Sequence, residues 1–242
     1  MTTLILQARL DSSRLPGKAL LPLGGRPLLF RVMEALARVP ADLHILACPE
    51  DAAAGFAPLA EEAAFIVSTG PKDDVLARYC AAIRRFKPER IIRATGDNPF
   101  VFADAAWAIH QEAQALDADY AGYQELPYGA GVESVKADAL LRAEREAVLP
   151  VEREHVCPYL YGHAELFQLH RPPAPPVWRA PGIRLTVDTP EDYRRAQALW
   201  SAQGAWALWS AQEAPIPGGF FPGEAIIAAY GRLWPATERS LP

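Results

Sequence analysis

The sequence has few cysteines and histidines, and neither residue type shows the spacing of a metal centre. The three cysteines, Cys48, Cys80 and Cys157, lie far apart in the 242-residue chain. The five histidines form no His-Glu-x-x-His arrangement, which argues against a zinc enzyme. Scattered thiols without a pairing pattern are typical of a reducing compartment. We therefore expect reduced cysteines and a cytoplasmic protein.

The sequence also lacks an excess of positive charge and a long apolar run. Its formal net charge is −5, so general binding of nucleic acid is not expected. No uninterrupted apolar segment is long enough to cross a bilayer, and no basic and apolar signal segment precedes the first predicted strand. We expect no membrane partner. Hydrophobic residues make up 50% of the chain, enough for a substantial core.

The opening segment combines a predicted buried strand with a basic loop. Residues 4–6 are an apolar run, which is typical of a buried strand. The loop that follows, residues 8–18, carries three cations: Arg9, Arg14 and Lys18. Cations held close together repel one another unless an anion lies among them. Because α/β sheets bind ligands at the carboxyl ends of their strands, this basic loop is predicted to hold a phosphate-rich ligand.

Two other interpretations of the basic loop were weighed. A solvated surface loop would have the same charged residues. A Walker P-loop does not fit, because Gly17-Lys18 is followed by Ala19 rather than Ser or Thr. In addition, Ser12 stands where a P-loop requires its first glycine.

Apolar segments and amphipathic segments alternate along the first half of the chain. Further buried strands are predicted at 43–47, 65–67 and 90–94, and helices at 27–36, 52–63, 73–86, 103–116 and 137–147. Strands that alternate with helices at this spacing pair in parallel. We therefore expect an α/β fold: a Rossmann-like, doubly wound, mixed and mostly parallel sheet with helices on both faces.

Two aspartates follow predicted strands. The strand at 90–94 leads into Thr95-Gly96-Asp97-Asn98-Pro99, and a strand predicted at 183–187 leads into Asp188-Thr189-Pro190-Glu191-Asp192. Each has a local explanation, since Asp97 is a turn residue and either Thr189 or Asp188 is placed to cap the helix that Pro190 begins. The alternative is that both converge on one Mg²⁺. With a nucleotide bound, Mg²⁺ takes one or two carboxylates together with phosphate oxygens and water.

Several of these strings together resemble the cytidylyltransferase family, which makes CMP-activated acidic sugars. The branch that the chain resembles most is the spore-coat polysaccharide (SpsF-like) cytidylyltransferases, over about residues 3–200. The matching strings are Gln7-Ala8-Arg9, Ser13-Arg14-Leu15-Pro16-Gly17-Lys18, Leu23-Gly24-Gly25-Arg26-Pro27-Leu28, Gly96-Asp97-Asn98-Pro99 and Asp188-Thr189-Pro190-Glu191-Asp192. The resemblance implies a nucleotidyltransferase that couples CTP to an acidic or acylated sugar, releases pyrophosphate and uses Mg²⁺ as its cofactor.

The resemblance also implies roles for individual residues. Asp97 and Asp188 would hold the metal, and the catalytic residues would be Lys18, Arg9, Arg14 and Asp97. The end of the third strand, with Ser68 and Arg78, would face the base, while Asp73 and Asp74 are equally suited to starting a helix. The expected nucleotide-binding residues are Gln7, Ala8, Arg9, Ser13, Arg14, Lys18, Ser68, Arg78 and Thr95.

A second group of residues is expected to bind the sugar. Residues 153–159 resemble the family's Arg-Glu-His-Val-Thr-Pro-Tyr string, with Cys157 in place of the threonine. The resemblance implies a sugar pocket built from Glu133, Arg153, Glu154 and His155. The alternative is that the charged members of this group cap a helix or form surface ion pairs, which contribute little each.

The expected domain organisation is a nucleotidyltransferase domain at 1–200 and an aromatic-rich extension at 201–242. The extension would pack on the core or on a partner subunit, and the family implies a homodimer. Two other functions remain open. A glycosyltransferase would use an Asp-x-Asp pair such as Asp117-Ala118-Asp119, and a non-catalytic nucleotide-binding protein would have the same fold.

Overall fold

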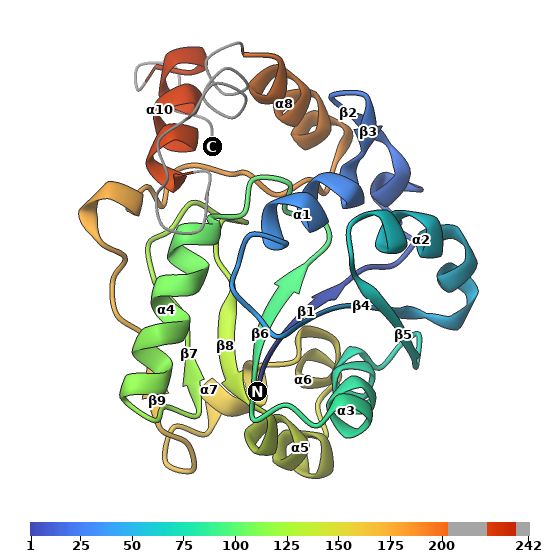
Figure 1. Ribbon diagram of the computed structural model, residues 1–242. Helices are drawn as coiled ribbons and strands as arrows, with labels where there is room; N and C mark the ends of the chain where they lie inside the picture. The colour runs from blue at the N-terminus through green and yellow to red at the C-terminus, as the bar shows by residue number, and fades with distance from the viewer. Residues whose placement is uncertain (203–221, 236–242) are drawn as a thin grey trace.

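The computed structural model describes residues 1–202 and 222–235, which fold into one central sheet with helices on both faces (Figure 1). The sheet contains β1 Thr2–Gln7, β4 Leu43–Pro49, β5 Ile66–Gly70, β6 Arg90–Thr95, β7 Tyr120–Ala121, β8 Glu133–Lys136 and β9 Leu169–His170. A separate ribbon pairs β2 Pro22–Leu23 with β3 Arg26–Pro27. The α-helices are α1 Leu28–Leu36, α2 Glu50–Glu62, α3 Val75–Phe86, α4 Ala103–Ala115, α5 Ala137–Glu146, α6 Pro150–His155, α7 Pro158–Gly162, α8 Pro190–Ser201 and α10 Gly223–Leu233.

The sheet is mixed and mostly parallel, which confirms the predicted fold class. Its strand order is β5-β4-β1-β6-β8-β7-β9. The first four strands in this order are parallel to one another, whereas β8 is antiparallel to both β6 and β7. The crossovers α1, α2 and α3 connect the parallel strands, as the alternation of strand and helix patterns predicted.

The central strand β1 is buried on both of its faces. Leu4 and Leu6 pack into the core beneath α1, α2 and α4, while Ile5 packs into the core beneath α3 and α5. Successive side chains of a strand point to opposite faces, so a continuous apolar run is what a strand between two helix layers requires. Each such side chain contributes about 1.5–3 kcal/mol when it is fully buried.

The strand order places two loops side by side. In the parallel pairing of β1 with β6, Gln7 lies opposite Thr95. The basic loop leaves the sheet directly after Gln7, and the loop at 96–99 leaves it directly after Thr95. Both loops therefore emerge at the carboxyl edge of the sheet, where ligands of open α/β sheets bind.

The prediction of a strand at 183–187 is wrong. This segment forms one isolated bridge, between Tyr128 and Arg184, and joins no sheet. Its backbone is instead bonded to loops: Leu185 N donates to Tyr128 O at 2.8 Å, and Val187 N donates to Asp97 O at 2.8 Å. The apolar side chains of this segment are buried, as their pattern predicted. The segments beside it are loops, so no hydrogen-bonded ladder can form.

The C-terminal part that the structure describes is a helix packed on the core. In α10, the side chains of Ile226, Ala229 and Tyr230 are buried against the layer that contains α4 and α8. Trp206, Trp209, Phe220 and Phe221, which carry most of the aromatic extension, lie outside the described residues. Within 1–202 and 222–235, no helix combines the length and the apolar character that crossing a membrane requires.

Candidate active site

A polar cavity of about 720 Å³ opens at the carboxyl ends of β1 and β6. Its wall contains the basic loop, the end of β6 with the following loop, and parts of the segments around residues 120–133 and 186–188. The predicted site residues that line it are Gln7, Ala8, Arg9, Ser13, Arg14, Lys18, Thr95, Asp97, Glu133, Glu154, His155 and Asp188. Ser68, Arg78 and Arg153 are not part of the wall.

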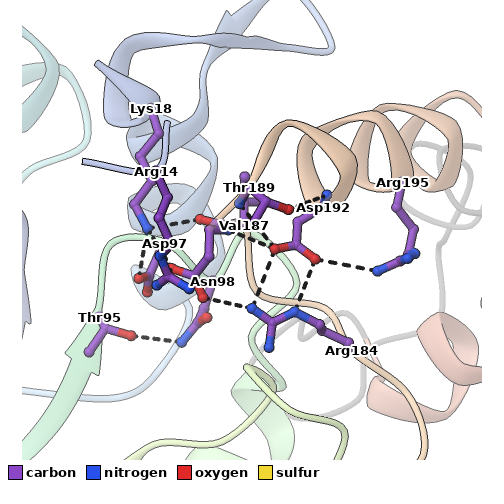
Figure 2. Close-up of polar contacts among 11 residues, drawn as sticks. Arg14, Lys18, Thr95, Asp97, Asn98, Arg184, Val187, Thr189, Asp192 and Arg195 are labelled. Carbon is purple, nitrogen blue, oxygen red and sulfur yellow. Dashed lines mark hydrogen bonds and ion pairs between the residues drawn. The ribbon is translucent and has the colours of Figure 1, made fainter. Parts of the chain in front are cut away.

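Lys18 joins the two aspartates that the sequence places far apart (Figure 2). Its Nζ donates to Asp97 Oδ2 at 3.0 Å and to Asp188 Oδ1 at 3.0 Å. It also donates to Val187 O at 2.8 Å. The Lys18 side chain is only 14% exposed, so its ammonium depends on these three oxygens in place of water. The two carboxylates thus converge on a single cation position.

The local fold of the basic loop explains how Lys18 reaches this position. Gly17 has a left-handed backbone with φ of 66°, which a residue with a Cβ adopts at a cost. The turn lets Lys18 N donate to Leu15 O at 3.2 Å and begins the short 3-10 helix Lys18–Leu20. Buried Ala19 anchors the turn in the core, and Lys18 is directed toward the sheet edge.

The other two cations of the loop are more exposed. An Arg14 guanidinium nitrogen lies 3.1 Å from Asp188 Oδ1, although the Arg14 side chain is 63% exposed. Arg9 lines the cavity and makes no ion pair with any residue that the structure describes. The loop therefore presents one largely buried cation, Lys18, and two more exposed cations that also line the cavity.

Asp188 is fixed by a chain of ion pairs that leads into α8. Its Oδ2 accepts from Arg184 Nη2 at 2.7 Å, and Arg184 Nε donates to Asp192 Oδ1 at 2.9 Å. The hydrogen bond to Asp192 raises the pKa of Arg184. Burial alone would raise the pKa of Asp192, but bonds from Arg184 and the Asp188 backbone lower it overall. Thr189 caps the helix in a capping box with Asp192, so Asp188 itself is not the cap.

The residues expected to face the base serve the structure around the cavity. Ser68 is buried in β5. Arg78 is fully buried and donates to Pro71 O at 2.9 Å and to Lys72 O at 2.6 Å. It also reaches Gln7 Oε1 at 3.4 Å, which connects it to a residue of the cavity wall.

Of residues 153–155, one ties helices together and the other two line the cavity. Arg153 pairs with Asp74 and donates to Glu144 O at 2.6 Å, so it ties α6 to α3 and α5. Asp74 is the cap of α3 and accepts from Ala77 N at 2.9 Å, which is the helix-start alternative stated above. Glu154 and His155 are exposed and line the cavity.

An ion pair on the cavity wall was missed by the sequence reasoning. Arg93 of β6 lies opposite Glu133 of β8 in the antiparallel register, and their side chains form a salt bridge. Tyr120 donates to the same carboxylate at 2.9 Å. Arg93 and Glu133 are 14% and 20% exposed, so the pair is largely removed from water. The signal was present: each residue is a charge directly after an apolar one, Arg93 after Ile92 and Glu133 after Val132.

The Asp-x-Asp pair considered for a glycosyltransferase lies away from the cavity. Asp117 and Asp119 lie 2.9 Å and 3.1 Å from Lys136 Nζ. In the β6–β8 register Lys136 lies opposite Arg90, which is at the other end of β6 from Thr95, and neither aspartate lines the cavity. In the described part of the chain, no group of three or more His, Cys, Asp or Glu side chains is placed to hold a metal.

Comparison with known proteins identifies the family. The cytidylyltransferase family model matches residues 3–214. The spore coat polysaccharide biosynthesis protein SpsF of Bacillus subtilis is 35% identical over 216 residues, covering 86% of this chain and 90% of that protein.

Two solved structures share the fold. A cytidylyltransferase from Leptospira borgpetersenii has a TM-score of 0.84 at 22% identity, over 100% of this chain and 98% of that one. CMP:2-keto-3-deoxy-manno-octonic acid synthetase complexed with CTP has a TM-score of 0.67 at 15% identity, over 84% and 99%. The family match and the SpsF relative confirm the resemblance found in the sequence. The chain belongs to the cytidylyltransferase family, whose members are nucleotidyl-transferring enzymes.

Proposed function

We propose that this protein transfers CMP from CTP to a sugar and releases pyrophosphate. The observation that carries the proposal is the position of Lys18 on the cavity wall. Its ammonium lies 3.0 Å from both Asp97 and Asp188. This arrangement gives one cavity a cationic side for phosphates and a pair of carboxylates beside it. The family match to cytidylyltransferases supports CTP as the nucleotide.

The basic loop would hold the triphosphate. Arg9 and Arg14 are exposed to the cavity, and Lys18 lies deeper in the same wall. Guanidinium groups suit phosphate oxygens because they donate two parallel hydrogen bonds. The hydroxyl of Ser13, which also lines the cavity, would add an uncharged donor.

Asp97 and Asp188 fit a Mg²⁺ ion. They supply carboxylate oxygens from two separate segments, and these oxygens already converge on one cation, the Lys18 ammonium. Mg²⁺ bound with a nucleotide needs few protein ligands, because phosphates and water complete its coordination. When bound, the ion would supply positive charge to polarise a phosphate.

The proposed reaction is a displacement at phosphorus. A sugar hydroxyl oxygen forms a bond to the α-phosphorus, and the bond from that phosphorus to the α,β-bridging oxygen breaks. Pyrophosphate leaves with the electron pair, and the hydroxyl proton passes to solvent. Negative charge grows on the phosphate oxygens, so fixed cations such as those of the basic loop are the groups that lower the barrier.

We propose an acidic or acylated sugar as the acceptor. It would occupy the part of the cavity beyond β6, where Glu133, Glu154 and His155 form the wall. Support comes from the SpsF relative, which is named for polysaccharide biosynthesis, and from the fold neighbour, which is named a synthetase of a CMP-linked octonic acid. Residues 1–200 would form the catalytic domain of a cytoplasmic homodimer, with 201–242 as its extension.

The test is a pyrophosphate assay. The protein is incubated with each of the four nucleoside triphosphates, Mg²⁺ and a panel of acidic and acylated sugars. Pyrophosphate released with CTP alone, in amounts equal to the CMP-sugar formed, is the expected result. In a parallel incubation with nucleotide-sugars in place of the triphosphates, consumption of a nucleotide-sugar without pyrophosphate would establish a glycosyltransferase instead. Asp119→Asn is the control variant, because Asp119 lies outside the cavity and should keep full turnover.

A further inference from the structure

Asp188 presents its two carboxylate oxygens to different partners. Oδ1 accepts from Lys18 Nζ at 3.0 Å and lies 3.1 Å from an Arg14 guanidinium nitrogen, so this oxygen belongs to the cation position. Oδ2 accepts from Arg184 Nη2 at 2.7 Å. The orientation of the carboxylate is therefore set by cations on two sides, and only one of these sides belongs to the basic loop.

Arg184 is held in place by a second acid. Its Nε donates to Asp192 Oδ1 at 2.9 Å and its Nη2 donates to Asp192 Oδ2 at 3.3 Å. The guanidinium also lies 4.8 Å from the centre of the Tyr128 ring. A planar guanidinium that binds a carboxylate through two nitrogens has a fixed direction as well as a fixed place.

Asp192 is anchored to the backbone at the start of α8. Its Oδ2 accepts from Asp188 N and from Thr189 N, both at 3.1 Å, and its side chain is 6% exposed. The contacts run from the backbone to Asp192, from Asp192 to Arg184 and from Arg184 to Asp188, and Figure 2 shows the contact between Asp192 and Arg184. The rigid start of a helix thereby controls a carboxylate at the cavity.

We infer that Arg184 is a positioning residue for the cation site, because it holds Asp188 with Oδ1 toward the cavity. The inference rests on the proposed function, since it requires Asp188 to bind a metal together with CTP. Arg184 is absent from the cavity wall, and its hydrogen bond to Asp188 connects it to the proposed metal ligand. Residues that orient a metal ligand typically change metal affinity about 10–100-fold when they are replaced.

The test uses Mn²⁺ as a probe, titrated into protein that holds saturating CTP without any sugar, with free Mn²⁺ followed by electron paramagnetic resonance. Arg184→Met removes the donors and keeps much of the side-chain volume. We expect its Mn²⁺ affinity to fall about 10–100-fold. CTP affinity without metal is expected to stay at the wild-type value, since the basic loop is untouched.

Arg195→Met is the matched control. Arg195 also contacts Asp192, at 3.3 Å, but its other partner is Glu191 rather than Asp188. This variant should bind Mn²⁺ as the wild type does. Equal losses in the two variants would overturn the inference, because they would indicate a general disturbance of α8.

The remaining outcomes also decide the matter. If the wild type binds Mn²⁺ with CTP and Arg184→Met binds it equally tightly, the role of Arg184 is overturned and the proposed metal site still stands. No Mn²⁺ binding by the wild type with CTP would overturn the proposed metal site as well. Where Arg184→Met shows no cooperative thermal transition, Arg184→Gln, which keeps one donor group, is measured with the same expectations.

Discussion

Lys18 and Asp97 are 79 positions apart in the chain, yet Lys18 Nζ lies 3.0 Å from Asp97 Oδ2. The contact exists because β1 and β6 are parallel neighbours, so the loops that follow them leave the sheet together. The same ammonium also binds Asp188, 170 positions away. One cation thus connects three segments around the cavity, and it is the group on which most of the following predictions depend.

Removal of the Lys18 ammonium should slow the reaction strongly. We expect Lys18→Ala to lower kcat at saturating CTP about 10²–10³-fold, the usual scale for the loss of one electrostatic contact in the transition state. The matched control is Lys136→Ala, since Lys136 also bridges two aspartates but lies outside the cavity. Steady-state pyrophosphate release measures both. Full turnover in Lys18→Ala would remove Lys18 from the catalytic residues.

Binding of the divalent metal should depend on the nucleotide. In the absence of CTP, Lys18 and Arg14 already neutralise Asp188, and Lys18 neutralises Asp97. Wild-type protein should therefore bind Mn²⁺ weakly alone and more tightly with CTP, whose phosphates attract the two cations. Lys18→Ala should bind Mn²⁺ alone more tightly than the wild type. Isothermal titration with and without CTP checks both expectations, and tight binding by nucleotide-free wild type would contradict them.

Asp97→Asn should lose metal-dependent activity and remain folded. The amide keeps the shape of the side chain but is a poor ligand for Mg²⁺. Lys18 keeps its contacts with Asp188 and Val187 O, so little of the fold depends on Asp97 alone. The measurements are the Mg²⁺ dependence of turnover and the thermal unfolding midpoint. An unchanged Mg²⁺ dependence would remove Asp97 from the metal site.

The Arg93–Glu133 pair should matter for stability. Arg93→Met leaves the Glu133 carboxylate in a poorly hydrated place without its cation, with the Tyr120 hydroxyl and the Cys157 thiol as uncharged partners. We expect a loss of about 3 kcal/mol in the free energy of unfolding, measured with urea. The double variant Arg93→Met/Glu133→Gln should lose less, because no unpaired charge remains.

A surface pair provides the control for this measurement. Arg26 forms an ion pair with Glu62, and their side chains are 37% and 54% exposed. Arg26→Met should therefore cost only about 0–1 kcal/mol. Equal losses in Arg26→Met and Arg93→Met would show that burial of the Arg93–Glu133 pair has no energetic consequence.

Acid should destabilise the fold partly through His110. This residue is fully buried between Thr2 and Ser134, and burial together with the charge of Arg90 lowers its pKa to about 4. The unfolded chain takes up a proton below about pH 6.5, but the folded protein does not until about pH 4. Stability therefore falls as the pH falls between these values, by about 3 kcal/mol for this group. His110→Gln should show a smaller loss between pH 7.5 and 4.5 in urea unfolding, and an equal loss would contradict the assignment.

Local patterns in the sequence were sufficient for most of the fold. The apolar run of β1, the alternation of strands with amphipathic helices, and Thr189-Pro190 at the start of α8 each depend on residues close together in the chain. The two aspartates could be expected near the basic loop because loops after parallel strands share one edge of the sheet. Which residues hold the nucleotide, the sugar and the metal stays a prediction.

Some features depended on contacts between distant segments. Arg93 faces Glu133 only because β8 is antiparallel to β6 in one particular register. Lys18 contacts both Asp97 and Asp188 because three segments far apart in the chain meet at one cavity. The sequence by itself determined the type of most elements and the chemistry carried by each loop, since these follow from neighbouring residues. Only the tertiary structure decided which charges meet, because strand order and register are properties of the whole sheet.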